Sequence, residues 1–273
     1  NVDQAEALNT AESMAKRALE IDPELSMAYS VLGDIHRDRY EWMKAKNNYL
    51  RSLALNPDNI EANEQFAQML WRASYFDEAL KYSTVATELD PLSWLNLCVH
   101  AALQYVSGDR ENGWKNMQQV FKIGGDKRYF PLRHAINIAI SEGEIESAAN
   151  FMEELSNSTR DHSFIPRDRA ELEKFIPLLH SREDTLAFLS TSRVQPASTG
   201  LNSAWSNDMF WAAYYGDYDL AETLFSNGIS SDDGSLLFDM TWFNYPIIGP
   251  LRNSEPYKRL VKNIKLDQFW REN

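Results

Sequence analysis

A proline recurs every 34 residues in the first part of the chain, at Pro23, Pro57 and Pro91. Small residues keep the same step in several further registers. These registers are Gly33, Ala67 and Ala101; Ala11, Ala45, Ala79 and Gly113; and Ala18, Ser52 and Ala86. Several registers at one period mark a repeated supersecondary unit, which buries its apolar face only by stacking on its neighbours. The periodicity therefore predicts a repeat array.

Each period predicts two antiparallel α-helices. Apolar residues such as Leu32, Phe66 and Leu70 follow helical spacing between the prolines. The small residues fit where two helices approach closely, because a larger side chain would force the backbones apart. A proline disfavours helix at the residue before it and suits the first turn of a new helix, so it separates the repeats. The predicted fold is an all-α, right-handed superhelical solenoid of antiparallel helix pairs, degenerate in its second half.

Two consecutive segments, AYSVLGDIHRDRYEWMKAKNNYLRSLALNPD and EANEQFAQMLWRASYFDEALKYSTVATELDP, resemble tetratricopeptide repeats. The C-terminal segment PIIGPLRNSEPYKRLVKNIKLDQFW resembles the closing part of bacterial repeat domains. Such domains are attached to winged-helix transcriptional regulators of the ToxR/CadC type, to adenylate cyclases and to protein kinases. The resemblance implies a protein-interaction or sensory domain of a bacterial regulator.

The strength of the repeat divides the chain into two expected parts. Residues 1–157 form the repeat array, with a partial first repeat, clear repeats at about 26–59 and 60–93, and degenerate repeats to 157. Residues 158–273 form degenerate helical repeats that end in a capping helix. The apolar face of that helix consists of Tyr257, Leu260, Val261 and Ile264. The chain starts within a helical pattern and without Met, which we interpret as a fragment of a longer protein.

Composition narrows the classes of partner. The net charge of −13 and the pI near 4.9 oppose binding to nucleic acid or to anionic lipid. A single cysteine, Cys98, excludes an internal disulfide and is expected to be buried. The sequence contains no run of about 18 apolar residues, which is the length that a membrane-spanning helix needs. We expect a soluble domain, cytoplasmic or periplasmic, whose oligomeric state and attachment to any membrane anchor stay open.

No pattern in the sequence predicts catalysis, a metal site or a cofactor. The five histidines show no HExxH spacing, and the chain has no nucleophile elbow, phosphate-binding glycine loop or dinucleotide fingerprint. The segment from Ser230 to Gly234 lacks most ligands of a calcium loop, so a solvated turn is expected there.

The resemblance to tetratricopeptide repeats implies a concave groove lined by the first helix of each repeat. The groove residues predicted for partner binding are Asp34, Arg37, Asp38, Glu64, Gln68, Trp71, Arg72 and Tyr105. Trp71 and Tyr105 lie 34 residues apart and are candidate anchors for a partner, unless packing covers them. The acidic side chains favour a basic or apolar partner.

The leading functional hypothesis is a non-catalytic scaffold that binds a protein or peptide. The alternative is a small-ligand sensor with an aromatic pocket in the second half, although aromatic residues at helical spacing usually form a core. The aromatic residues concerned are Trp205, Phe210, Trp211, Tyr214, Tyr215, Tyr218, Trp242, Phe243 and Tyr245. An enzyme with a dispersed active site is a third and weaker hypothesis.

Overall fold

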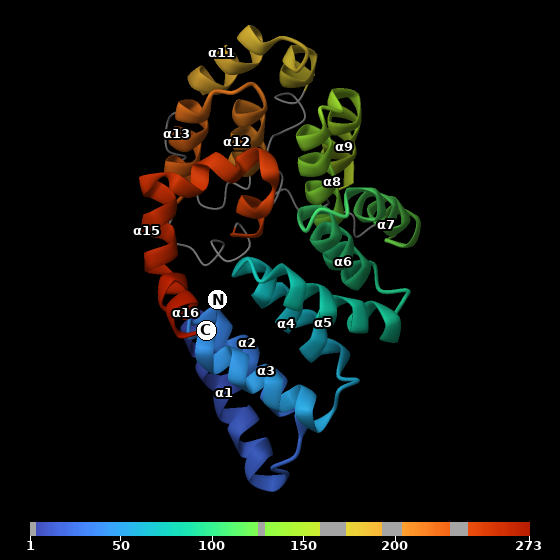
Figure 1. Ribbon diagram of the computed structural model, residues 1–273, viewed down its shortest axis with the longest axis vertical. Helices are drawn as coiled ribbons and strands as arrows, with labels where there is room; N and C mark the ends of the chain where they lie inside the picture. Colours follow the sequence, from blue (N-terminus) through green and yellow to red (C-terminus); the bar gives the residue numbers. More distant parts are fainter. Residues whose placement is uncertain (1–3, 125–128, 159–172, 193–203, 230–239) are drawn as a thin grey trace. The chain divides into compact units, whose positions relative to one another are not determined.

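The computed structural model describes residues 4–124, 129–158, 173–192, 204–229 and 240–273 (Figure 1). These residues form helices and turns, and no strand occurs among them. The structure therefore confirms the all-α class and the array of helical repeats. Within the described residues, no helix combines the length and the apolar character needed to cross a bilayer.

The chain divides into two compact units, one formed by Asn1–Leu103 with Val261–Asn273 and the other by Gln104–Leu260. These two units do not coincide with the boundary expected between residues 157 and 158. That boundary marks where the repeat pattern in the sequence fades, and it stays a prediction. The helices of the first unit pair as the repeat predicts, α2 with α3 and α4 with α5. They are α1 (Gln4–Ile21), α2 (Ser26–Asp38), α3 (Trp42–Leu55), α4 (Ile60–Arg72), α5 (Phe76–Leu89), most of α6 (Trp94–Val106) and α16 (Leu266–Glu272).

The turn inside each helix pair repeats its backbone geometry every 34 residues. Tyr40, Ser74 and Gly108 all have positive φ, at 58°, 65° and 105°. A left-handed residue here lets the chain reverse while the next amide closes the end of the first helix. The amide of Glu41 donates to the carbonyl of His36 at 2.8 Å, and the bonds at the next two turns match it. Glycine occupies only the third of these positions, so the first two repeats hold non-glycine residues in this conformation.

The turn between repeats also recurs. The helices α1, α3 and α5 each end two residues before the repeat proline, as predicted. The side chains of Asp22, Asn56 and Asp90 then each accept a bond from the backbone amide two residues later, at 3.0, 3.1 and 3.3 Å. These side-chain turns replace helical bonds that the proline removes. The proline and the residue before it thus together form the turn that ends one repeat.

Close packing inside the pair of α2 and α3 explains one of the small residues. A Cβ atom on Gly33 would lie 2.7 Å from the ring of Tyr49. Tyr49 is completely buried, and its ring stacks on Phe66 of α4 with 5.4 Å between centroids. Ala45, which lies in another small-residue register, is also completely buried. The small residues therefore lie at helix contacts, as predicted.

The second unit continues the helix pairs, α8 with α9 and α12 with α13. Gly216, with φ at +77°, separates the last pair. The elements are α7 (Arg110–Ile123), α8 (Tyr129–Glu142), α9 (Ile145–Ser158), η2 (Ile176–Leu178), α11 (Arg182–Ser192), α12 (Ala204–Tyr214), α13 (Tyr218–Ile229), η3 (Met240–Asn244), η4 (Pro246–Asn253) and α15 (Glu255–Asn263). The turn expected at Ser230 to Gly234 lies outside the described residues.

The C-terminal segment returns to the first repeats. The four residues of the predicted apolar face, Tyr257, Leu260, Val261 and Ile264, are all buried. Beyond them, α16 packs against α3. The expectation that this helix caps an exposed end of the solenoid stays a prediction. Val261–Asn273 belongs to the same compact unit as the N-terminal repeats, because its aromatic residues pack at the turns of those repeats.

Candidate functional site

The predicted groove residues lie on the first helix of successive pairs. Asp34, Arg37 and Asp38 come from α2, four others come from α4, and Tyr105 comes from α6. Spacings of three and four residues place each set on one side of its helix. All of them except Tyr105 belong to the first unit.

Arg37 is the centre of the polar contacts between these helices. Its guanidinium lies 3.1 Å from Asp34 Oδ1 and 3.0 Å from Asp38 Oδ1. It also donates to Gln65 Oε1 on α4 at 2.5 Å. The hydroxyl of Tyr49 on α3 donates to Asp34 Oδ1 at 2.6 Å. One arginine therefore joins the acidic side chains of α2 to α4, and Asp34 extends the network to α3.

Burial shapes the electrostatics of Asp34. Loss of hydration raises the pKa of its carboxyl, and the attraction of Arg37 and the bond from Tyr49 oppose that rise. The side chains of Asp34 and Asp38 nevertheless keep 27% and 31% of their surface exposed. They form the accessible edge of the network.

On α4 a second row of polar groups is almost fully covered. Glu64, Gln68 and Arg72 are 7%, 7% and 5% exposed. Gln68 donates to Glu64 at 3.0 Å, and Arg72 donates to Gln68 at 3.4 Å. Burial, together with the negative charges of Glu61 and Asp34, raises the pKa of Glu64 to about 7. Burial and the positive charge of Arg37 lower the pKa of Arg72 to about 9.

The two aromatic candidates are interior residues. Trp71 and Tyr105 are each 1% exposed. The hydroxyl of Tyr105 donates to Glu142 Oε1, and the guanidinium of Arg110 lies 5.8 Å from the centre of its ring. Neither aromatic side chain is accessible to a partner in this conformation, so the alternative that packing covers them describes the structure better. Binding through the remaining groove residues stays a prediction.

Sequence reasoning did not find Tyr49 and Gln65 as members of this site. Tyr49 lies on the second helix of its pair, whereas only the first helices were expected to line the concave groove. Gln65 occupies the same repeat position as Val31 and Val99, and this change from apolar to polar was a usable signal. The bond from Gln65 to Arg37 depends on how two repeats stack, which no local pattern records.

The cysteine and the histidines of the described residues lie in structural surroundings. Among the described residues, no three His, Cys, Asp or Glu side chains converge as a metal site would require. Cys98 is completely buried, and burial raises the pKa of its thiol well above the ordinary value. His100 Nδ1 lies 3.0 Å from Ser83 Oγ, and His134 Nδ1 lies 2.8 Å from the hydroxyl of Tyr245. His134 is therefore a buried histidine with a polar partner, and His100 is a half-buried one.

The aromatic residues of the second unit pack together. Phe210, Trp211, Phe243 and Tyr245 are buried. Phe210 and Tyr245 make an edge-to-face contact at 5.6 Å between centroids. The side chains of Trp205 and Trp242 lie outside the described residues. These four residues thus belong to a core, which disfavours the small-ligand pocket, and the other described members, Tyr214, Tyr215 and Tyr218, are half-buried.

Comparison with known proteins gives similarity of fold. No protein-family model matches the chain, and no curated protein matches it. Among solved structures, PilW, a widely conserved type IV pilus biogenesis factor, aligns with a TM-score of 0.54 and 12% identity. That alignment covers 96% of this chain and 92% of PilW. A tetratricopeptide repeat protein from Parabacteroides merdae ATCC 43184 aligns with a TM-score of 0.57 and 15% identity, covering 97% of this chain and 94% of that protein.

These two likenesses extend over nearly the whole chain, including its irregular second half. At such low identity they show the tetratricopeptide-like fold. The clear sequence resemblance ends near residue 125, whereas the fold similarity does not end there. Helix packing is therefore kept where the consensus residues are lost.

Proposed function

We propose that the chain is a non-catalytic scaffold that binds a protein or peptide along the accessible edge of α2 and α4. The observation that carries this proposal is the pair of half-exposed carboxylates, Asp34 and Asp38, held in place by the guanidinium of Arg37, whose side chain is 12% exposed. Fixed polar groups bind with a smaller entropic cost than mobile ones. The edge is therefore organised before a partner arrives.

The charge of this edge favours a basic partner. Glu61 at the start of α4 is exposed, and its negative charge adds to burial in raising the pKa of both Asp34 and Glu64. The chain as a whole carries −13. Complementary charge speeds encounter with a cationic segment and disfavours an acidic one. A basic segment with some apolar residues is the expected ligand.

The wider context follows from the sequence resemblance. The C-terminal segment resembles domains of bacterial winged-helix regulators and adenylate cyclases, and the repeat fold occurs in a protein from Parabacteroides merdae. We propose that the scaffold serves as the sensory or interaction domain of a bacterial regulatory protein. Recognition of a regulatory partner then depends on the edge of α2 and α4.

A peptide-binding experiment tests the edge. We would measure a set of labelled 15-residue peptides, with basic, neutral and acidic members of equal apolar content, by fluorescence anisotropy. The variant Asp38→Asn/Glu61→Gln removes two charges from the edge. The control Asp77→Asn/Glu78→Gln removes two charges from exposed positions on α5. The basic peptides should bind the wild type and the control alike, and should bind the edge variant about tenfold more weakly, which corresponds to roughly 1.4 kcal/mol.

Salt provides a second measurement. Binding of the basic peptides should weaken as ionic strength rises, because exposed charges are screened within about 10 Å at 0.1 M salt. Equal binding by the edge variant and the control, or preference for acidic peptides, would contradict the proposal. Melting curves of both variants identify any loss that comes from unfolding.

A further inference from the structure

The turns of the first two helix pairs carry a small aromatic surface, which we name the socket. It consists of the rings of Trp42 and Tyr75 and the backbone carbonyl of Ala73. The helix α16 fills it, because Phe269 contacts both rings and the indole of Trp270 donates to the carbonyl. Both the socket and α16 belong to the first compact unit. The socket is therefore a surface that binds a short aromatic helix.

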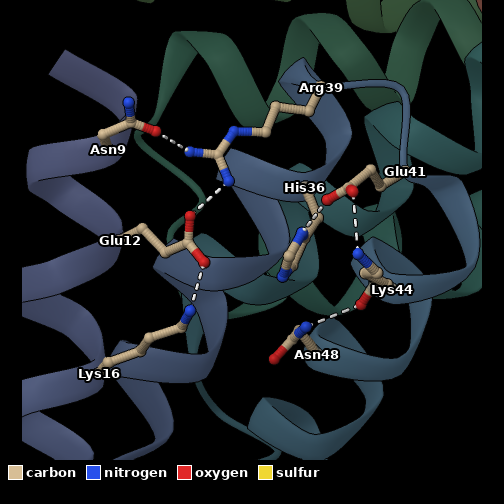
Figure 2. Close-up of polar contacts among 8 residues, drawn as sticks. All are labelled: Asn9, Glu12, Lys16, His36, Arg39, Glu41, Lys44 and Asn48. Carbon is tan, nitrogen blue, oxygen red and sulfur yellow. Dashed lines mark hydrogen bonds and ion pairs between the residues drawn. The ribbon is translucent and has the colours of Figure 1, made fainter. Parts of the chain in front are cut away.

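Polar contacts hold the turn between α2 and α3, which forms one side of the socket. Arg39 donates to Asn9 Oδ1 on α1 at 2.8 Å (Figure 2). Glu41 lies 2.5 Å from His36 Nδ1 and accepts a bond from Lys44 at 2.8 Å. The bonds from Lys44 and His36 lower the pKa of Glu41, so this carboxylate stays charged at neutral pH. All of these contacts come from the first three helices and their turn, so they do not require α16.

The turn between α4 and α5 forms the other side of the socket. The amide of Tyr75 donates to the carbonyl of Leu70 at 2.9 Å, which closes the end of α4. The side chains of Leu70 and Ala73 are buried inside the repeat. Both sides of the socket are therefore shaped by the repeats themselves, and the socket can receive an equivalent helix from another molecule.

The connection between α15 and α16 is a hinge with one left-handed residue. Lys265 has φ at 57° and ψ at 23°, and its amide donates to the carbonyl of Lys262 at 3.1 Å. A lysine takes this conformation at a cost that glycine avoids, because its Cβ atom crowds the backbone. The contacts of α16 at the socket thus hold the hinge in a conformation that its own residue disfavours.

The directions of the side chains show what an open hinge would do. If Lys265 took the helical conformation, α15 and α16 would form one uninterrupted helix. With 3.6 residues per turn, the apolar side chains of α16 would then point about 180° away from the apolar face of α15. These side chains are Leu266, Phe269 and Trp270. The face of α15 is buried against its own chain, so an open hinge turns α16 toward other molecules.

We infer that two copies of this chain exchange α16, so that each hinge opens at Lys265 and each α16 fills the socket of the other copy. A second copy supplies the same helix and the same socket, so the contacts of the closed form are made again between the copies. The exchange is reciprocal, as a dimer with two-fold symmetry requires. The hinge conformation and the protein concentration then set the balance between monomer and dimer. This surface differs from the edge of α2 and α4, and each proposal can fail alone.

Substitutions at the hinge test the exchange in both directions. Lys265 is exposed, so replacing it leaves the core unchanged. Lys265→Gly suits the left-handed conformation and disfavours a continuous helix, so it should weaken dimer formation by a factor of about 10 or more. Lys265→Val should strengthen dimer formation, because a β-branched residue fits the left-handed conformation poorly. Sedimentation equilibrium over a range of protein concentrations measures the dissociation constants of the wild type and both variants.

A mixture of two defective chains tests which groups meet. Phe269→Ala/Trp270→Ala removes the aromatic groups of α16 and keeps the socket, whereas Tyr75→Ala damages the socket and keeps α16. Each variant alone should form less dimer than the wild type, and the mixture should form heterodimers. Sedimentation velocity with one chain labelled at its amino terminus detects them. The control mixture uses a chain with all three substitutions in place of Tyr75→Ala, and it should not form heterodimers.

Three outcomes would overturn the inference. The first is that the wild type and Lys265→Val both stay monomeric up to the highest soluble concentration. The second is dimer formation that Lys265→Gly and Phe269→Ala/Trp270→Ala leave unchanged, since such a dimer uses another surface. The third is a mixture of the defective chains that forms no heterodimer while melting curves show both to be folded. The edge variant Asp38→Asn/Glu61→Gln should dimerise like the wild type, which separates this test from that of the proposed function.

Discussion

Trp42 donates its indole N–H to the backbone carbonyl of Ile264 at 2.6 Å, although 222 residues separate them in sequence. The bond is buried and fixes the C-terminal segment at the start of α3. Phe269 then lies between the rings of Trp42 and Tyr75, at 6.2 and 5.7 Å between centroids. Trp270 donates to the carbonyl of Ala73 at 2.9 Å. The last residues therefore join the turns of two successive repeats.

Phe269→Ala should lower the free energy of unfolding by about 3 kcal/mol, because the ring is 1% exposed and its removal leaves a cavity between two other aromatic rings. Chemical denaturation followed by tryptophan fluorescence measures the change. Arg271→Ala is the control, since Arg271 is exposed and pairs with Asp267 along α16. Equal stability of the two variants would show that the segment is not docked on the repeats in solution.

The sequence predicts the array well because the repeat signals are local. Pro23, Pro57 and Pro91 end helices through backbone constraints that act within a few residues. No local sequence pattern of this kind predicts where Phe269 packs. Its packing depends on aromatic residues at two turns meeting a segment far along the chain, and an amphipathic pattern predicts that a helix is buried without specifying its partner.

In the candidate site, too, local sequence patterns predict some features, whereas others depend on contacts between residues that are distant in sequence. The spacing of Asp34, Asp38 and Gln68 on the first helices follows from the 34-residue register, and the structure keeps that placement. Burial of Trp71 does not follow from it, because exposure depends on neighbours that are distant in sequence. The register therefore predicts that Trp71 and Tyr105 occupy equivalent positions in their repeats. It does not predict whether a partner can reach either side chain.

Gly33→Leu should lower the free energy of unfolding by about 1–3 kcal/mol or more, because even a Cβ atom at this position lies 2.7 Å from the Tyr49 ring. The buried ring is enclosed by two helices and has little room to move. Urea denaturation provides the measurement. Gly249→Ala is the control, since a Cβ there meets nothing within 4 Å. A Gly33→Leu variant as stable as the wild type would refute the assigned helix contact.

Trp71→Ala should lower stability by about 3–5 kcal/mol, as expected for loss of a large side chain from the interior. Leu92→Ala removes an apolar side chain that is 77% exposed and should change stability by less than about 0.5 kcal/mol. Thermal melting by circular dichroism compares them. If Trp71→Ala melts like the wild type, the indole is not a packed residue in solution and its role as a partner anchor becomes tenable again.

Glu64→Gln should stabilise the protein at neutral and alkaline pH. The pKa of Glu64 is raised from 4.5 to about 7, mainly by burial, so the folded chain holds this proton more tightly than the unfolded chain. Between these two values the unfolded state ionises first, and stability falls as pH rises. The contribution of the protonated carboxyl is fully present below about pH 4.5 and is lost above about pH 7.

Glutamine at position 64 keeps an oxygen that accepts the bond from Gln68 and removes the buried charge. The gain over wild type should therefore be on the order of 2–3 kcal/mol at pH 8 and should shrink toward zero near pH 4. Urea denaturation at several pH values provides the measurement, with Glu78→Gln on the exposed side of α5 as the control. A difference between Glu64→Gln and wild type that stays constant from pH 4 to 8 would mean that the pKa of Glu64 is the same in the folded and unfolded chains, and that burial does not raise it.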